Sequence, residues 1–250
     1  PGQGTVLNLR GCAECLCDPE MMARLAATGY TELGFDSIMP VFSIIQESSA
    51  LGCKMQWEQK DNWPTVRMRE PIWRDVDDIR IPNDFLTHPD TVCVIEAIKL
   101  LRKEFGDEVA IIGKTMGPWT LGYHCFGVEP FLLMSLDDPG KTKLALERMK
   151  EATIQFGVAQ IEAGADALTL PDHATGDLVS GEYYDRYLKD MHAEFVDLIP
   201  VHHRPERLQI VGAAVLVFQI IGVFPDVGAQ NDLAPLLDHI HQRIVLVRGG

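Results

Sequence analysis

The chain has 250 residues, 46% of them hydrophobic, which is enough to bury one sizeable core, and we expect a single domain over 1–250. Its 36 acidic and 22 basic residues give a formal net charge of −14, which opposes binding to nucleic-acid phosphates and to anionic membranes. The sequence shows neither an uninterrupted apolar stretch of membrane-spanning length nor a secretory signal. We therefore expect a soluble cytoplasmic protein with no nucleic-acid or membrane partner.

Six cysteines are too few for a disulfide framework in a chain of this length, so we expect them to be reduced. Three of them lie close together, at Cys12, Cys15 and Cys17. Thiolates at this spacing can converge on one soft metal ion, but such a site normally needs a second ligand cluster, and no further Cys-x-x-Cys pair follows. These three cysteines could therefore form a metal site or could be three separate free thiols.

An αβ pattern occurs three times along the chain, at 25–36, 161–170 and 208–218. In each segment a predicted helix ends near a glycine, and an apolar strand follows within a few residues. This arrangement predicts buried parallel strands joined by helices, in either a βα barrel or a doubly wound sheet.

Two further helices can be delimited between these units. Residues 90–105 have apolar side chains on one helical face, with Gly106 as the stop, and 109–113 then predict a strand. Residues 141–163 predict a longer helix that ends at Gly164.

The remaining segments are less regular. Ser180 predicts the N-cap of a helix that continues to about residue 196. Residues 37–45 predict a strand, and 57–82 an irregular excursion from the scaffold.

Glycine- and proline-rich loops follow two of the apolar runs, within 111–122 and 159–177. In α/β barrels the active site lies at the carboxyl ends of the strands. These two loops are therefore the main candidates for a functional site.

Several motifs together resemble the uroporphyrinogen decarboxylase superfamily over about residues 19–198. They are Phe42-Ser43 with Ala50-Leu-Gly52, Gly117-Pro-Trp-Thr-Leu121, Gln160–Ala165, and Asp172 followed by Gly176-Asp-Leu-Val-Ser180. The resemblance implies a TIM (β/α)8 barrel, and we expect this barrel to be atypical or truncated after about residue 200.

Within the superfamily, residues 40–52 are most similar to the corrinoid-dependent methyltransferases of the methylcobamide:coenzyme M branch. The decarboxylase branch has an Arg-rich N-terminal segment and an Asp after the Phe-Ser pair, whereas here Ile44 and Ile45 follow Ser43. The resemblance implies methyl transfer from a corrinoid on a partner protein to a small thiol such as coenzyme M, with zinc keeping the thiol deprotonated. A tetrapyrrole decarboxylase and a non-catalytic corrinoid-binding barrel are the alternatives.

The chain departs from the zinc-binding pattern that this branch implies. His202 stands where the resemblance places a ligand histidine, but Arg204 occupies the position of the paired cysteine, and no cysteine follows Cys125. A guanidinium cannot ligate zinc. His202 remains the metal candidate, and we expect this chain by itself to be inactive in thiol methylation.

Asp172 and Glu47 are the catalytic candidates, because each follows a predicted strand. Asp172 could orient a substrate or move a proton, or could only cap a turn or a helix start. Glu47 could ligate a metal or act as a base, or could be an ordinary carboxylate in the first turn of a helix.

The candidate binding residues line the same loops. Trp119 and Met116 could present an apolar face to a flat macrocycle or could fill the core, and a lone His124 is more often packed than ligating. The predicted binding set is Ser43, Met116, Gly117, Trp119, Tyr123 and His173.

Overall fold

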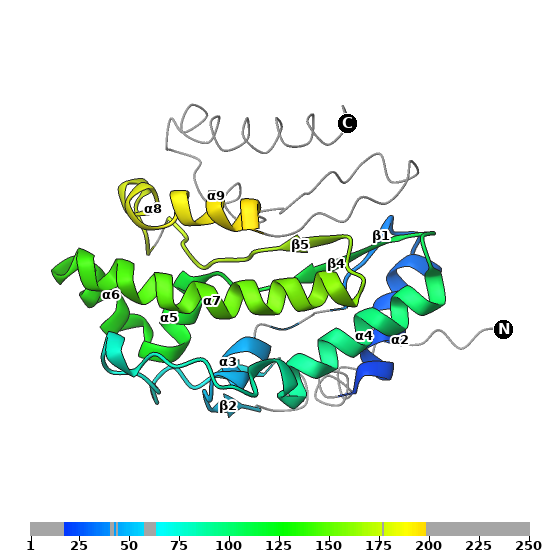
Figure 1. Cartoon of the computed structure of the whole chain (residues 1–250), viewed down its shortest axis with the longest axis horizontal. Coiled ribbons are helices and arrows are strands. Elements are labelled where there is room, and N and C mark those ends of the chain that lie inside the picture. Colours follow the sequence, from blue (N-terminus) through cyan, green and yellow to red (C-terminus); the bar gives the residue numbers. More distant parts are fainter. Residues whose placement is uncertain (1–17, 41–42, 44, 58–63, 177, 199–250) are drawn as a thin grey trace.

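A computed structural model describes residues 18–198 except 41–42, 44, 58–63 and 177. Its central feature is a parallel sheet in the order β1-β4-β5 (Figure 1). The three strands are β1 (Ser37–Ile38), β4 (Ala110–Lys114) and β5 (Ala167–Thr169). Ile38 is paired with Ile111 and Gly113 with Leu168, so all three carboxyl ends point to the same edge. The α/β class with parallel strands is confirmed, and the described strands do not show a closed barrel.

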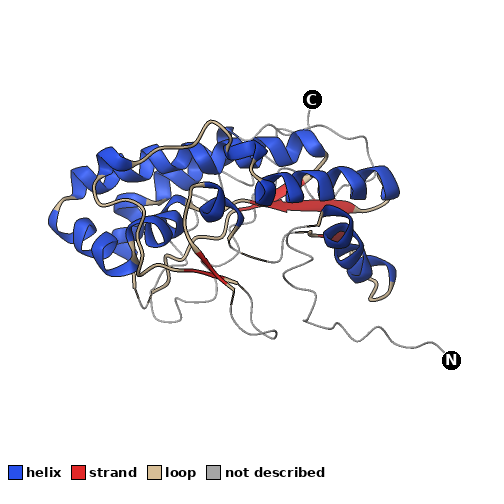
Figure 2. Ribbon diagram, turned by 90° about the horizontal axis from the view of Figure 1, so that it is seen from below, coloured by secondary structure: helices blue, strands red, loops and turns tan. Residues whose placement is uncertain are grey.

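Helices connect and cover these strands (Figure 2). The helix α4 leads from β1 to β4 and α7 leads from β4 to β5; both contact β4 and each other, and α2 packs beside α4. These helices are α2 (Pro19–Thr31), α4 (Pro89–Phe105) and α7 (Pro139–Ala163). The αβ unit predicted at 161–170 is confirmed by the end of α7 and by β5. In the unit predicted at 25–36, α2 continues through Gly29 to Thr31, and the strand, β1, begins only at Ser37. The third unit, 208–218, lies outside the described residues.

Local sequence signals account for where the long helices begin and end. Each begins with Pro at the first position, where a missing N–H costs nothing, and the preceding side chain accepts a backbone hydrogen bond. These N-caps are Asp18, His88 and Asp138. Gly106 (φ 55°) and Gly164 (φ 116°) follow α4 and α7 in backbone conformations that favour glycine, as the sequence predicts.

Two predictions about the irregular segments were wrong. The strand expected over 37–45 ends at Ile38, and the short helix α3 (Gln46–Ala50) follows. The segment 57–82 contains part of a small antiparallel hairpin, β2 (Met55–Gln56) with β3 (Thr65–Val66). Strand pairing across the residues between them is a tertiary property that local periodicity does not reveal.

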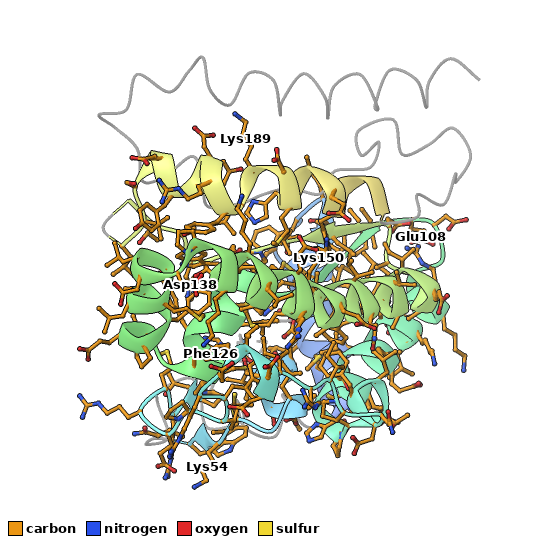
Figure 3. The ribbon with its side chains drawn as sticks, turned by 60° about the vertical axis from the view of Figure 1, so that its left-hand side comes forward. Lys54, Glu108, Phe126, Asp138, Lys150 and Lys189 are labelled. Atoms are coloured by element: carbon orange, nitrogen blue, oxygen red, sulfur yellow. The ribbon has the colours of Figure 1, made fainter. Side chains whose placement is uncertain are left out.

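The predicted helix over 180–196 is two helices, α8 (Gly181–Tyr187) and α9 (Lys189–Leu198). Ser180 caps the first by accepting from the backbone N–H of Tyr183, as expected. Leu188 interrupts the run because its φ of −116° departs from the helical value. Figure 3 shows Lys150 of α7 close to α9, where its ammonium contacts Glu194 at 2.7 Å.

Short helical elements complete the described part of the fold. They are η2 (Val76–Asp78), η3 (Phe85–Thr87), α5 (Pro118–Phe126) and α6 (Val128–Asp137). Every residue of α5 is buried, so this helix lies inside the core rather than on its surface. No helix in the described residues is long and apolar enough to cross a membrane.

Candidate functional site

A buried polar cluster lies where the parallel strands end. Backbone pairing continues past the strands, because the Thr115 N–H donates to Thr169 O (3.0 Å) and the Gly117 N–H to Pro171 O (2.9 Å). These bonds hold the loop after β4 against the loop after β5, where sequence analysis placed the candidate site. We call the following side chains the strand-end cluster: Ser43, Gln46, Glu47, Ser48, Lys114, Met116, Trp119, Thr120, Tyr123, His124, Asp172, His173, Tyr184 and His192.

Asp172 binds the first turn of α5. Its Oδ1 accepts from the Thr120 backbone N–H (2.7 Å) and hydroxyl (2.8 Å). Its Oδ2 lies 3.4 Å from the backbone nitrogen of Trp119 and 3.3 Å from His192 Nε2. A carboxylate at this position satisfies N–H groups that the helix itself leaves unpaired. The geometry thus supports the helix-capping role for Asp172 and also makes it the partner of a buried histidine.

Gly117 permits this close approach. A Cβ built on Gly117 would lie 2.2 Å from Asp172 Cγ and 2.3 Å from Oδ2, far inside van der Waals contact. The φ of Gly117 is −67°, so its small size rather than backbone freedom makes glycine necessary here. Of the predicted binding residues, Gly117 therefore shapes the wall of the cluster.

Glu47 lies in the first turn of α3 and is fully buried. Its Oε1 accepts from the Met116 N–H at 2.7 Å, across 69 residues of sequence, while Oε2 is buried with no hydrogen-bond partner in the structure. An ordinary first-turn carboxylate would face solvent. Glu47 instead links the segment after β1 to the end of β4, and its second carboxylate oxygen has no hydrogen-bond partner among the described residues.

Lys114, the last residue of β4, was missed by the sequence analysis. Its ammonium is buried and donates to Ser43 O. Burial lowers the pKa of Lys114, and the negative charge of Glu47 opposes that shift. The detectable signal was a lysine at the end of the apolar run Ile111-Ile-Gly-Lys114.

His124 shares a 2.6 Å hydrogen bond with Ser48 Oγ through its Nδ1. Burial, followed by the nearby charges of His173 and Lys114, lowers the pKa of His124 to about 4, while Asp172 opposes the shift. The imidazole is therefore neutral near pH 7 and acts as a hydrogen-bonding group rather than a cation.

Trp119, Tyr123 and Met116 are buried in the core. The Trp119 ring packs edge-on against Phe131 (centroids 5.1 Å apart) and Tyr123 (6.1 Å), and lies 5.7 Å from Tyr187. The Trp119 ring is therefore packed against other aromatic side chains, which corresponds to the prediction that it fills the core rather than to contact with a flat macrocycle. Any polar contact with a ligand would use the indole N–H.

His173 and Ser43 complete the predicted set. The His173 N–H donates to Thr120 Oγ1 at 2.7 Å, and its side chain is half-buried beside His124. Ser43 is buried, and its hydroxyl donates to Gln46 Oε1 at 3.1 Å. The structure thus brings Asp172 and His173 together at Thr120, in the loop after β4. Lys114 connects the other two predicted residues, because its ammonium donates to Ser43 O and interacts with the charge of Glu47.

Six buried polar atoms of the described strand-end cluster have no partner at strict hydrogen-bonding geometry, although two of them, Trp119 Nε1 and Tyr123 Oη, lie close enough to interact with each other. They are Gln46 Nε2, Glu47 Oε2, Trp119 Nε1, Tyr123 Oη, Tyr184 Oη and His192 Nδ1. A buried polar group without a partner is unfavourable by about 1–3 kcal/mol, so native proteins rarely contain several in one region. A bound water molecule or a polar ligand at this cluster would complete these hydrogen bonds.

The described residues contain no group of three or more His, Cys, Asp or Glu side chains suited to a metal ion. They therefore do not fit the zinc ion that the family resemblance implies. His202 and the group of Cys12, Cys15 and Cys17 lie outside the described residues, and their metal binding stays a prediction.

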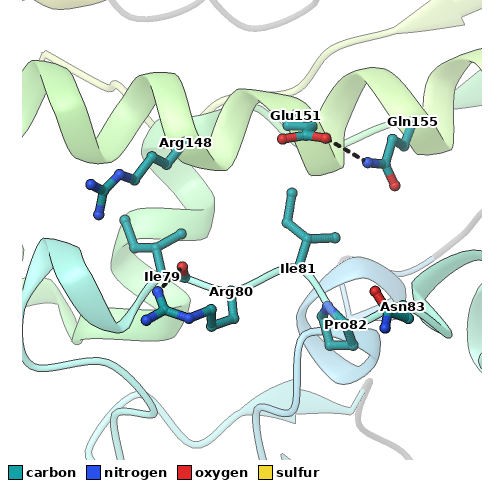
Figure 4. Close-up of a pocket in the computed structure, with 8 residues that line it drawn as sticks. All are labelled: Ile79, Arg80, Ile81, Pro82, Asn83, Arg148, Glu151 and Gln155. Carbon is teal, nitrogen blue, oxygen red and sulfur yellow. Dashed lines mark hydrogen bonds between the residues drawn. The ribbon is translucent and has the colours of Figure 1, made fainter.

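A surface hollow with a volume of about 460 Å³ lies between α7 and the loop joining η2 to η3 (Figure 4). Arg80 and Arg148 are in its lining, but both already bind backbone carbonyls, of Ile79 and Val76 respectively. Its lining shares no residue with the strand-end cluster.

Comparisons with known proteins identify relatives of this chain. Methylcobamide:CoM methyltransferase MtaA of Methanosarcina barkeri is 31% identical over 183 residues, covering 73% of this chain and 54% of the relative. A uroporphyrinogen decarboxylase of Ruegeria pomeroyi is 25% identical and covers 75% of this chain and 55% of its own length. A solved methyltransferase from Methanosarcina mazei, 27% identical, matches 75% of this chain and 56% of its own with a TM-score of 0.71.

The chain spans about half the length of the curated relatives it matches. The family profile described as uroporphyrinogen decarboxylase (URO-D) matches residues 6–223, which include every described element. The chain therefore belongs to the uroporphyrinogen decarboxylase family, and its similarity extends to methyltransferases within it.

Proposed function

We propose that this protein transfers a methyl group from a methylated corrinoid, carried by a partner protein, to a small thiol such as coenzyme M. The similarity to methylcobamide:CoM methyltransferase MtaA supports this reaction. In it, a thiolate attacks the methyl carbon, the cobalt–carbon bond breaks with its electron pair left on cobalt, and a thioether forms. We also propose the TIM barrel, atypical or truncated after about residue 200, and the cytoplasmic location that the sequence predicts.

The observation that carries the proposal is the set of six unpaired polar atoms at the strand ends. Gln46 and Glu47 follow β1, Trp119 and Tyr123 follow β4, and Tyr184 and His192 lie on the helices after β5. Barrel enzymes hold substrates at the carboxyl ends of the strands. A bound polar ligand would provide the missing hydrogen bonds.

The individual roles follow from the contacts. Glu47 Oε2 is an unpaired acceptor, so we assign it to a donor group of the ligand, with the ammonium of Lys114 supplying positive charge nearby. Asp172 is a positioning residue, because it orients α5 and His192 through direct hydrogen bonds. No step is assigned to zinc, since the described residues do not supply a ligand set for it.

Absorbance titration with methylcobalamin and a thiol-dependent demethylation assay with coenzyme M test the proposal. Both are run on the protein isolated from its native source, with its intact mass measured, and on the 250-residue chain. We expect turnover with the native protein. For the chain alone we expect binding without turnover, because it spans about half the length of the methyltransferase relatives.

Matched variants connect the activity to the site. Glu47→Gln should weaken methylcobalamin or thiol binding, whereas Glu151→Gln changes an exposed carboxylate on α7 and should have no effect. Absence of demethylation by the native protein would exclude the transferase. Methylcobalamin binding without turnover by the native protein would support the non-catalytic corrinoid-binding alternative.

Tetrapyrrole decarboxylation is the second candidate, favoured by the 25% identity to a uroporphyrinogen decarboxylase. In the described part of the strand-end cluster Lys114 is the cationic side chain, and His124 is neutral near pH 7. A substrate with many carboxylates requires more positive charge than this. Loss of carboxyl groups from uroporphyrinogen in the presence of the native protein would reverse this preference.

A further inference from the structure

Two cysteines that are distant in sequence meet in the core beside the strand-end cluster. Cys53 Sγ lies 3.6 Å from Cys125 Sγ, although the two residues are 72 positions apart in sequence, and neither thiol is part of a disulfide. Cys53 follows α3, the helix that carries Glu47 and Ser48, and Cys125 follows His124 on α5. The two sulfur atoms are in van der Waals contact and face one another.

Hydrogen bonds position both cysteines: the Cys53 backbone N–H donates to Ser48 O (2.9 Å), and its thiol lies 3.6 Å from His124 O. The carbonyl of Cys125 accepts from the N–H groups of both Ile72 (2.9 Å) and Trp73 (3.1 Å), within a fully buried helix. Cys53 comes directly after Gly52, whose φ of 102° marks the turn out of α3. A bond between the sulfurs needs a contraction to about 2.05 Å, which a small side-chain adjustment at Cys53 can supply.

We propose that Cys53 and Cys125 form a redox-active dithiol site, which a low-molecular-weight disulfide such as oxidised glutathione converts into an intramolecular disulfide. This assignment does not depend on the proposed methyl transfer.

The chemistry balances in two exchange steps. Cys53, the more accessible of the two, attacks one sulfur of oxidised glutathione as a thiolate, forming a mixed disulfide and releasing one glutathione thiolate. Cys125 then attacks Cys53 Sγ, forms the internal bond and releases the second glutathione. Two protein thiols are oxidised by two electrons, one glutathione disulfide is reduced, and the thiol protons pass to solvent or to the released thiolates.

The rate is set by access and by ionisation. Burial, together with the neighbouring Cys53 thiol, raises the pKa of Cys125 well above its ordinary value, so the second step should accelerate with increasing pH. Low reactivity at neutral pH is therefore part of the expected behaviour.

The disulfide would link the segment after α3 to α5, the two elements that carry Ser48 and His124 of the strand-end cluster. The segment carrying Ser48 and the helix carrying His124 already share a 2.6 Å hydrogen bond, and the new bond would lie a few residues from it on each side. Cross-linking two segments this far apart in sequence restricts the unfolded chain strongly, so the oxidised protein should melt at a higher temperature.

The test incubates the reduced, folded chain with oxidised glutathione at pH 8.5, then unfolds it and alkylates the remaining thiols. We expect a mass loss of about 2 Da attributable to the core pair and a cross-linked peptide joining Cys53 to Cys125. Peptide mapping separates this product from any pairing among Cys12, Cys15 and Cys17. Cys93→Ser is the matched control, because it removes a buried thiol on α4 and should leave the cross-link unchanged.

Cys53→Ser and Cys53→Ala should each abolish the cross-link and the increase in melting temperature while leaving Cys125 open to alkylation. Complete alkylation of both core thiols in the wild-type chain after prolonged oxidation would overturn the assignment. Cross-linking of either thiol mainly to another cysteine would do the same. So would a bound soft metal ion that protects both thiols without a covalent link.

Discussion

Asp172 Oδ1 accepts hydrogen bonds from both the backbone N–H and the hydroxyl of Thr120, at 2.7 and 2.8 Å, across 52 residues of sequence. The same Thr120 hydroxyl accepts from the His173 N–H at 2.7 Å. Thr120 therefore connects the beginning of α5 to two consecutive residues of the loop after β5.

Replacing Thr120 with Val should lower the free energy of unfolding by about 1–2 kcal/mol, because it leaves the part-buried backbone N–H of His173 without its acceptor. Thr120→Ser keeps the hydroxyl and should retain most of that stability. Urea denaturation of the two variants measures the difference. Equal stability of the Val and Ser variants would show that the hydroxyl contributes nothing.

Gly117→Ala should destabilise the fold by about 1–3 kcal/mol, since the added methyl group would overlap Asp172 and force one of the loops to move. Gly181→Ala is the matched control, because nothing lies within 4 Å of its added Cβ and the residue begins a helix. Thermal melting of both variants tests the pair. A Gly117→Ala protein as stable as Gly181→Ala would contradict the close approach of Asp172.

The pH dependence of stability should contain a contribution from His124, whose folded-state pKa is lowered to about 4. Below an unfolded pKa of about 6.5 the unfolded chain binds a proton at this residue that the folded chain does not. The free energy of unfolding should therefore decrease as the pH falls from about 6.5 to 4, by up to about 3 kcal/mol, and this contribution should level off below 4.

His124→Gln should remove that part of the pH dependence, as followed by urea denaturation between pH 4 and 7.5. A His124→Gln protein that keeps the wild-type slope would place the titration elsewhere.

Glu47 and Lys114 should be energetically coupled, because the charge of Glu47 favours the ammonium that burial opposes. Glu47→Gln and Lys114→Gln should each destabilise the protein, and the double variant should be less destabilised than the sum of the two. A coupling free energy of about 1 kcal/mol is expected from a double-mutant cycle in urea. Strict additivity would indicate that the two side chains act independently.

Part of the fold could be predicted from the sequence because its signals are local. Asp138 with Pro139 begins α7 and Gly164 ends it, and these residues act within one helical turn of their own position. The same reasoning located Gly106 after α4 and Ser180 before α8. The hairpin of β2 and β3 was missed because its stability depends on pairing between separate segments.

The candidate site also combines features that local sequence signals predict with features that depend on contacts between distant segments. Sequence motifs determined the family, the αβ connectivity and the importance of the loops that contain Gly117 and Asp172. Only the tertiary structure decided that Lys114 is buried against Ser43, that His124 meets Ser48, and that Cys53 meets Cys125. The partners in each of these pairs are more than 70 residues apart, and burial of such groups is set by packing, which no local pattern encodes.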